Sequence, residues 1–227
     1  MFNQEEIKNI SEILERIANT ATGEIMNDYA QDLKSPEDDI RGFETEMTGS
    51  IRTKINESLL DSLKKELDNN ILGRYLFKVQ TFKGKGQEPF VGADILGKLE
   101  IEICGQSILK YFLVQSKVAK TTRKGLTFGD SNMLRQANLM LTHTPDSFFF
   151  LYNKGGIKVV SAFMIKLLKR RTLSTSLIGH KTFGQFYTDH FNCFIGDNRH
   201  WQFTVNPGIL PSDFVQYIID IKITKNQ

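Results

Sequence analysis

Hydrophobic residues recur at helical spacing in the first third of the chain. Apolar positions between Ile7 and Ile17 are three and four residues apart, which predicts a helix within the first 33 residues. The polar stretch KSPEDD then breaks the pattern. From Phe43 to Leu67 apolar residues return every fourth position, which predicts a long amphipathic helix ending near residues 69–70.

Further along, the pattern changes to short runs rich in β-branched and aromatic residues. RYLFKVQTF predicts one strand, and FVGADILGKLEIEICGQSILKYFLVQSKV predicts a hairpin of two more. Ser131 can cap a short helix that ends near Thr142. SFFFLYN and IKVVSAFMI predict two strands around a turn. The Phe-rich tail gives no clear assignment.

The order of these elements is a helix, three strands, a helix and further strands. Antiparallel hairpins combined with a helical crossover predict an α/β fold with a mixed central β-sheet flanked by helices, and an αβββαβ core. We expect residues 1–40 to form an N-terminal helical appendage for oligomerisation or partner docking, and residues 41–227 to form the main domain.

Composition places the chain among ordinary globular proteins. With 227 residues, of which 40% are hydrophobic, it can bury a substantial core. Only two cysteines, Cys104 and Cys193, are present and they are far apart, so a secreted disulfide scaffold is not expected. No apolar run approaches the roughly 20 residues that cross a bilayer. We therefore expect a cytoplasmic protein without a membrane span.

Charge is distributed unevenly along the chain, although the formal net charge is only +3. Residues 103–188 hold 13 Lys and Arg against 2 Asp and Glu, whereas residues 1–102 hold 13 against 20. A strongly basic central module is typical of a surface that binds polyanions such as nucleic acid. Solvated lysines scattered over every face would give the same count.

Polar side chains interrupt the apolar hairpin. Residues two apart on a strand point to the same face, so Gln115 and Lys117 lie together. If the turn is the Gly105–Gln106 pair, or a four-residue loop about the same centre, Asp94 lies directly opposite Lys117. A three-residue loop with a bulge would shift this register. The group is either a functional site or a cross-strand ion pair worth about 0.2–1 kcal/mol; apolar neighbours indicate central strands, where buried charge is costly.

An acidic residue in a GAD strand, followed by an apolar strand carrying x-Q-x-K, resembles the PD-(D/E)XK nuclease superfamily. This is the restriction-endonuclease-like fold, in the Gln-x-Lys variant of Mrr-type nucleases. The resemblance covers roughly residues 43–165. Two positions depart from the pattern: Ala93 replaces the proline of the first motif, and Gln115 replaces the usual second acid, which weakens metal ligation.

In that superfamily the first core helix contributes a glutamate, and Phe43-Glu44-Thr45-Glu46-Met47 resembles its usual form. At about 100° per residue, Glu44 falls on the flank of the apolar stripe and Glu46 falls farther round. Glu44 is the first candidate and Glu46 the second. Alternatively, both are favourable acids in the first turn of a helix.

The helix after the hairpin carries a further candidate. Gln136 lies between Met133 and Met140, beside the apolar side of its helix. A buried amide requires a partner. In related nucleases a glutamine of this helix reaches the active site, and Gln136 matches its position; a polar residue of the helix packing is an equal alternative.

The resemblance implies metal-dependent phosphodiester hydrolysis with Mg²⁺ or Mn²⁺. It assigns Asp94, the Ser116 carbonyl, Glu44 and Glu46 to the metal, and implies that Lys117 activates or orients water. Gln115 would ligate weakly or position the scissile phosphate, with Gln136 nearby. Residues expected to hold the DNA backbone are Lys120, Arg123, Lys124, Lys166, Lys169, Arg170 and Arg171.

The function implied by the resemblance is a DNA endonuclease, serving prokaryotic defence against foreign, for example phage, DNA. Because one site cuts one strand, we expect a homo-oligomer or a partner subunit. The alternative is a catalytically weak or inactive nucleic-acid-binding or assembly subunit on the same fold, since Gln115 stands where an acid is usual.

Overall fold

The structure of the protein is a computed structural model. The structure describes residues 5, 8–13, 15–16, 18–20, 22–23, 65, 75–83, 91–103, 106–123, 125–129, 131–153, 156–170, 173–192 and 217–225.

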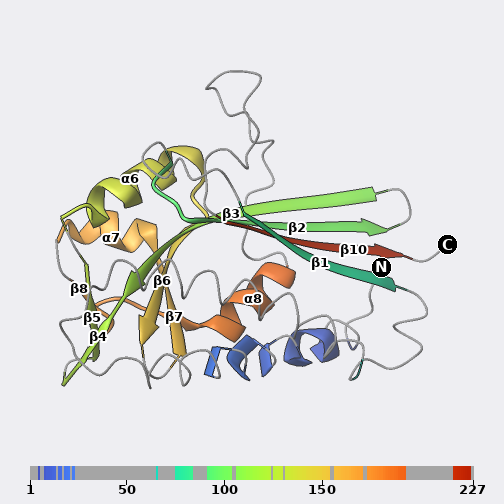
Figure 1. Ribbon diagram of the computed structural model, residues 1–227, viewed down its shortest axis with the longest axis horizontal. Coiled ribbons are helices and arrows are strands. Elements are labelled where there is room, and N and C mark those ends of the chain that lie inside the picture. The colour runs from blue at the N-terminus through green and yellow to red at the C-terminus, as the bar shows by residue number, and fades with distance from the viewer. Residues whose placement is uncertain are drawn as a thin grey trace.

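A seven-stranded mixed sheet forms the centre of the fold (Figure 1). Its strands, in spatial order, are β1 (Tyr75–Lys83), β10 (Tyr217–Lys225), β2 (Ile95–Ile103), β3 (Gln106–Val118), β6 (Ser147–Asn153), β7 (Gly156–Ser161) and β9 (Lys181–Thr182). The β10–β2 and β3–β6 pairs are parallel, and the other pairs are antiparallel. The predicted α/β class with a mixed central sheet is confirmed.

Three helices with described bounds, the partly described N-terminal helix and a small second sheet complete this architecture. The helices with described bounds are α6 (Met133–His143), α7 (Ala162–Leu168) and α8 (Phe183–Phe191). The N-terminal helix is described at residues 5, 8–13, 15–16, 18–20 and 22–23. The small sheet contains β4 (Lys120–Thr122), β5 (Gly125–Phe128) and β8 (Leu173–Ser174). The order β1, β2, β3, α6, β6 agrees with the predicted core. The helix predicted before β1 lies outside the described residues, apart from Lys65, which is helical.

Two local predictions were wrong. The run IKVVSAFMI does not remain a strand, because Ser161 ends β7 and its hydroxyl accepts a hydrogen bond from the Phe163 N–H, which starts α7. The N-cap of α6 is Asn132, one residue after the predicted Ser131, and it makes no side-chain capping bond. Both errors concern element boundaries.

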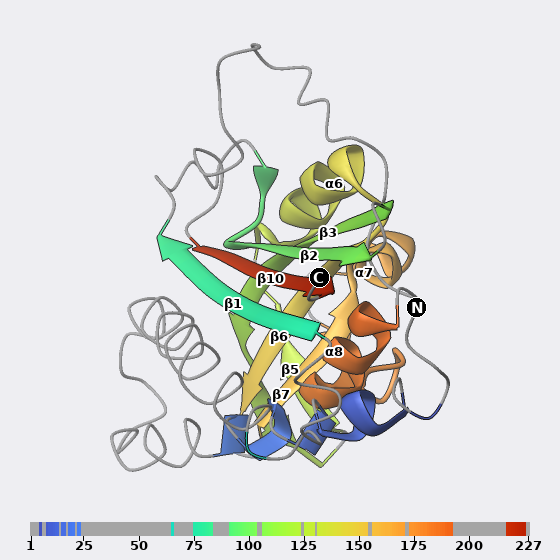
Figure 2. The same cartoon turned by 90° about the vertical axis from the view of Figure 1, so that its right-hand side faces the viewer.

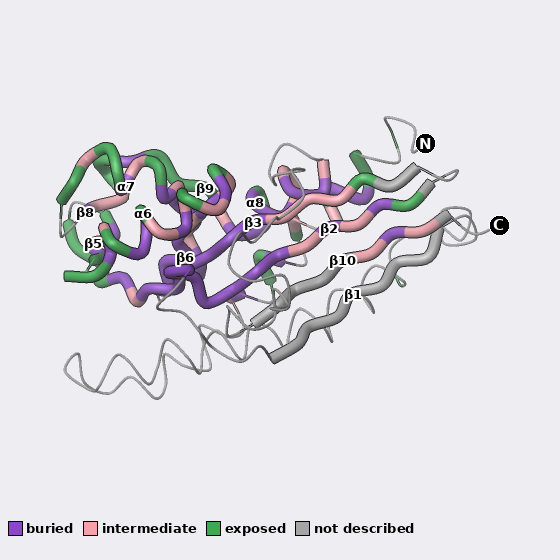
Figure 3. The backbone as a smooth tube through the Cα atoms, turned by 90° about the horizontal axis from the view of Figure 1, so that it is seen from above, coloured by how far each residue is buried: buried purple, intermediate pink, exposed green. Residues whose placement is uncertain are grey.

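The two faces of β3 pack against different helices. Leu113 belongs to a core that includes Met133, Ala137 and Met140 of α6. Phe112, on the opposite face, meets α8, where the rings of Phe186 and His190 stack edge-on against it at 4.9 and 4.6 Å. The helices α6 and α8 therefore cover opposite faces (Figure 2). Buried residues run through the middle of β3 and along β6 between them (Figure 3).

The N-terminal helix packs on α8. The Ser11 hydroxyl donates to Asn192 Oδ1 at 3.1 Å, and the Thr188 hydroxyl donates to the Ser11 carbonyl at 3.1 Å. The Asn19 side chain accepts from the Gly184 N–H at 3.1 Å, and a β-carbon at Gly184 would collide with the Glu15 carbonyl. The boundary predicted near residue 40 lies outside the described residues, and the separate role of residues 1–40 stays a prediction.

Gly97 provides a test of this packing. A β-carbon at Gly97 would overlap the ring of Phe112, its cross-strand partner, which is buried. We expect Gly97→Ala to lower the free energy of unfolding by about 3 kcal/mol through overpacking, measured by urea denaturation. Gly179→Ala is the matched control, because nothing lies within 4 Å of a β-carbon there. Equal stability of the two variants would contradict the packing described.

None of the described helices has the length and apolar character needed to cross a membrane.

Candidate active site

The candidate site lies where the chain enters β2, next to the end of β3. Ile95 pairs with Val114, and Ile103 pairs with Gln106, which fixes the register of the β2–β3 hairpin. The Asp94 N–H donates to the Val114 carbonyl at 2.8 Å, and this register places Asp94 opposite Gln115. The predicted pairing of Asp94 with Lys117 is therefore wrong by two residues. A shift of two leaves every side chain on its face, so the predicted common face is retained.

The Asp94 side chain accepts two hydrogen bonds from β3. Its Oδ2 accepts from Gln115 Nε2 at 2.7 Å and from the Ser116 backbone N–H at 2.8 Å. Gln115 Nε2 also approaches the Ser116 carbonyl at 3.3 Å. The strand thus holds a carboxylate in a fixed position beside a buried amide.

Gln115 and Lys117 alternate with residues of the opposite face, and both lie on the side of the sheet covered by α6. Their neighbours in β6 are Phe149 and Leu151, two members of the apolar core under α6 and α7. The exposed fractions are 6% for Asp94, 2% for Gln115 and 7% for Lys117. A carboxylate and an ammonium so far from water interact more strongly than they would at the surface.

Gln136 approaches the same place from α6. It is 4% exposed, and a β-carbon at Gly92 would lie 2.7 Å from the Gln136 carbonyl oxygen. Gly92, with φ at +75°, therefore lets the chain pass close to α6 two residues before Asp94. The predicted location of Gln136 beside the apolar side of its helix is confirmed, because it is buried together with Met133, Ala137 and Met140.

The opposite face of β3 contains polar groups that the sequence analysis missed. The hydroxyls of Ser116 and Tyr152 are hydrogen-bonded at 3.0 Å. Burial raises the pKa of Tyr187 well above its usual range, with a smaller contribution from Tyr152. Its hydroxyl has no hydrogen-bond partner among the described residues. A β-strand tyrosine carries no sequence signal of such a contact, because the partner comes from another strand.

Oxygen atoms at the site suit a hard cation. Gln115 Oε1 is buried and has no hydrogen-bond partner in the described part of the chain, and Asp94 and the Ser116 carbonyl lie beside the same amide. Mg²⁺ and Mn²⁺ prefer carboxylate, carbonyl and water oxygens, and Mg²⁺ keeps several waters. The residues therefore fit such an ion. Within the described ranges no cluster of three or more His, Cys, Asp or Glu could hold a metal.

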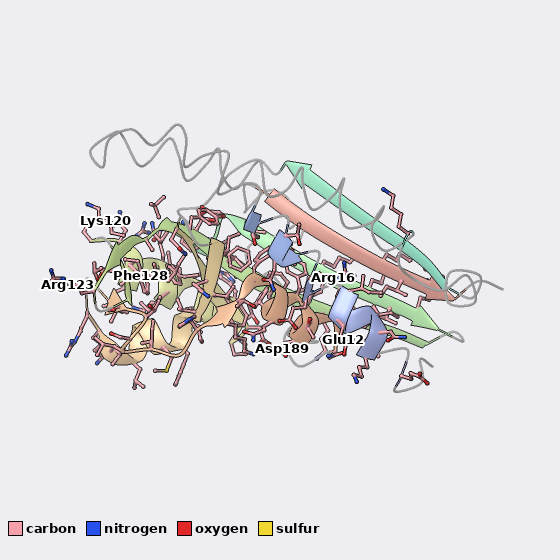
Figure 4. The ribbon with its side chains drawn as sticks, turned by 90° about the horizontal axis from the view of Figure 1, so that it is seen from below. Glu12, Arg16, Lys120, Arg123, Phe128 and Asp189 are labelled. Carbon is pink, nitrogen blue, oxygen red and sulfur yellow. The ribbon has the colours of Figure 1, made fainter. Side chains whose placement is uncertain are left out.

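The remaining candidates divide by location. Glu44, Glu46, Lys124 and Arg171 lie outside the described residues. The other predicted DNA contacts are all exposed: Lys120, Arg123, Lys166, Lys169 and Arg170. Figure 4 shows Lys120 and Arg123 at one end of the molecule, away from Glu12 and Arg16 of the N-terminal helix.

The two acidic residues of β2, Glu100 and Glu102, form ion pairs with lysines away from the candidate site. Glu100 accepts from Lys98 and from Lys222 of β10, each at 2.9 Å, and these two hydrogen bonds hold the pKa of Glu100 below its usual range. Glu102 lies 3.3 Å from Lys222. This half-exposed ion-pair network leaves Asp94 as the carboxylate of the β2–β3 hairpin that faces Gln115.

No protein-family model matches this chain, and no match was found among curated proteins or among solved structures.

Proposed function

We propose that the protein is a metal-dependent endonuclease that hydrolyses phosphodiester bonds in DNA. The observation that carries the proposal is the attachment of the Asp94 carboxylate to Gln115 and to the Ser116 N–H, one residue from the buried Lys117. Metal-dependent phosphodiester hydrolysis uses a fixed carboxylate, an amide oxygen and an ammonium on one face of a sheet. The resemblance of GAD and x-Q-x-K to the PD-(D/E)XK pattern supports the same function.

Asp94, the Ser116 carbonyl and Gln115 Oε1 would hold Mg²⁺ or Mn²⁺, with Glu44 or Glu46 as proposed further ligands. The bound cation supplies Lewis acidity toward water and the scissile phosphate. Lys117 orients the attacking water and stabilises the negative charge that develops on the phosphate. Burial strengthens this electrostatic contribution, because little bulk water screens it.

Gln136 has a proposed positioning role. Its helix packs on the chain at Gly92, so α6 fixes the segment that leads into Asp94. Its buried side chain would orient the scissile phosphate or a water molecule. The basic residues of the central module would hold the flanking DNA backbone without reading its sequence.

Two further parts of the proposal rest on the resemblance. The endonuclease would act in a prokaryotic cytoplasm against foreign DNA. It would work as a homo-oligomer or with a partner subunit, because cleavage of both strands of a duplex requires two sites.

A second candidate is a nucleic-acid-binding or assembly subunit with weak or no activity. The observation that favours it is the burial of the site: Asp94, Gln115 and Lys117 are each less than a tenth exposed. Substitution of an acid by Gln115 points in the same direction, because it removes one negative ligand.

One assay separates the two candidates. Supercoiled plasmid is incubated with the protein in Mg²⁺ or Mn²⁺, with EDTA in the control, and DNA binding is measured in parallel by gel retardation. The nuclease predicts nicked and linear DNA that depends on the metal. Retardation without metal-dependent cleavage would refute the nuclease and favour the binding subunit.

A further inference from the structure

A groove of about 510 Å³ opens between α6 and the end of α7, outside the candidate active site. Its lining includes Arg135 of α6 and the consecutive Lys169 and Arg170 that follow α7. Ser131, Asn138 and Thr142 add hydroxyl and amide groups to the same groove. The groove therefore offers three cations and three neutral hydrogen-bonding groups to one ligand.

The three cations have no acidic partner among the described residues. Arg135, Lys169 and Arg170 are all exposed, and no carboxylate of the described chain lines the groove. Elsewhere in the same structure exposed or half-exposed lysines do find carboxylates, as in the pair of Lys181 with Asp189 on the α8 side. A concentration of uncompensated positive charge in one concave surface attracts anions.

The groove and the candidate site lie on opposite sides of α6. Gln136 and Ala137 are buried toward the sheet, whereas Arg135 and Asn138 are exposed toward the groove. An α-helix with its side chains is about 10 Å across, which corresponds to about three nucleotides along one strand of a duplex at about 3.4 Å each. A strand bound in the groove would thus pass within a few nucleotides of Asp94.

We propose that this groove binds the sugar–phosphate backbone of a nucleic acid strand, with Arg135, Lys169 and Arg170 contacting phosphates. This inference rests on the proposed function and names a substrate contact for it, including Arg135, which charge patterning alone does not select. Leu134 and Leu139 in the groove can contact sugars, and the neutral polar groups can donate to phosphate oxygens. Since these groups recognise backbone, binding is independent of base sequence.

The test compares the salt dependence of binding for the wild type and the triple variant Arg135→Gln, Lys169→Gln, Arg170→Gln. Fluorescence anisotropy with a labelled single strand and the corresponding duplex is measured in EDTA, between about 50 and 200 mM salt. Each lost phosphate contact lowers the slope of log affinity against log salt by about 0.7 for a single strand and about 0.9 for a duplex. For three lost contacts, the slope should therefore fall by about 2 with the single strand or by about 3 with the duplex. Comparison of the two probes shows which form of nucleic acid binds in the groove.

The matched control removes three cations that do not line the groove: Lys8→Gln, Lys65→Gln, Lys110→Gln. It changes the net charge equally, and its slope should stay close to the wild-type value. An unchanged slope in the groove variant, or an equal loss in the control, would overturn the proposal.

Lys169→Gly provides a second variant that is independent of misfolding. Lys169 has φ at +51°, a conformation that glycine adopts without strain, so its backbone is retained when the ammonium is removed. Its slope should fall by about 0.7 to 0.9. Since binding is measured without metal, a wild type that binds but does not cleave would refute the nuclease and leave the groove standing. Metal-dependent cleavage by the wild type, together with an unchanged salt slope in the groove variants, would support the nuclease and refute the groove.

Discussion

Lys117→Met is expected to reduce metal-dependent DNA cleavage by a factor of about 10²–10⁴, the usual contribution of a positioned acid–base group. Lys117 lies on the same face of β3 as Gln115, and the residue is only 7% exposed, so bulk solvent replaces its charge poorly. Methionine has a similar length and suits the apolar neighbours, among them Leu151. The measurement is the single-turnover cleavage rate at saturating protein, which reports the chemical step.

Lys110→Met is the control for this substitution. It makes the same change at the other end of β3, where Lys110 pairs with Leu99, and its cleavage rate should match that of the wild type. DNA affinity in EDTA should be unchanged in both variants. Wild-type cleavage by Lys117→Met would remove Lys117 from the proposed chemistry.

The hairpin shows which part of a site local sequence can predict. The period of two placed Asp94, Gln115 and Lys117 on one face, because alternation does not depend on which strand residues are paired. The predicted partner of Asp94 was wrong, because a two-residue loop is compatible with the predicted register and equally with the observed one, in which Ile103 pairs with Gln106. The observed register is favoured by hydrogen bonds, because it brings the side-chain amide of Gln115 and the backbone N–H of Ser116 to the Asp94 carboxylate.

The hydrophobic pattern of the sequence could not predict which distant strands pair in the sheet. β10 lies between β1 and β2 although more than a hundred residues separate it from either. Its sequence, YIIDIKITK, is rich in isoleucine, but nothing local indicates that a C-terminal strand will enter the middle of the sheet. Likewise, α8 was not predicted, although Thr182 and Gln185 form a capping box at its start. That signal could have identified the helix in the Phe-rich tail.

The apolar run at β7 and α7 illustrates a different limit. Ile157, Val159 and Val160 have the β-branched character of a strand, and the following residues are equally apolar. Hydrophobicity alone does not tell a buried strand from a buried helix. The hydroxyl of Ser161, which caps α7, is the local feature that separates the two elements.

Asp94→Asn is expected to lower cleavage by about 10³, comparable to the loss of a principal charge-stabilising group, and to abolish stabilisation of the protein by divalent metal. Asparagine retains an oxygen that can accept from the Ser116 N–H, so the local fold should persist. It loses the negative charge that an oxygen-seeking cation requires. A ligand that binds only the folded state raises its stability in proportion to the logarithm of concentration, so Mn²⁺ should raise the melting temperature of the wild type.

The melting temperature of Asp94→Asn should not respond to Mn²⁺, whereas Asp189→Asn should respond as the wild type does. Asp189 lies on α8, where it pairs with Lys181, so this control makes the same chemical change away from the site. A purely structural role for Asp94 predicts a lower melting temperature with the metal response intact. That result, especially with cleavage preserved, would exclude Asp94 as a metal ligand.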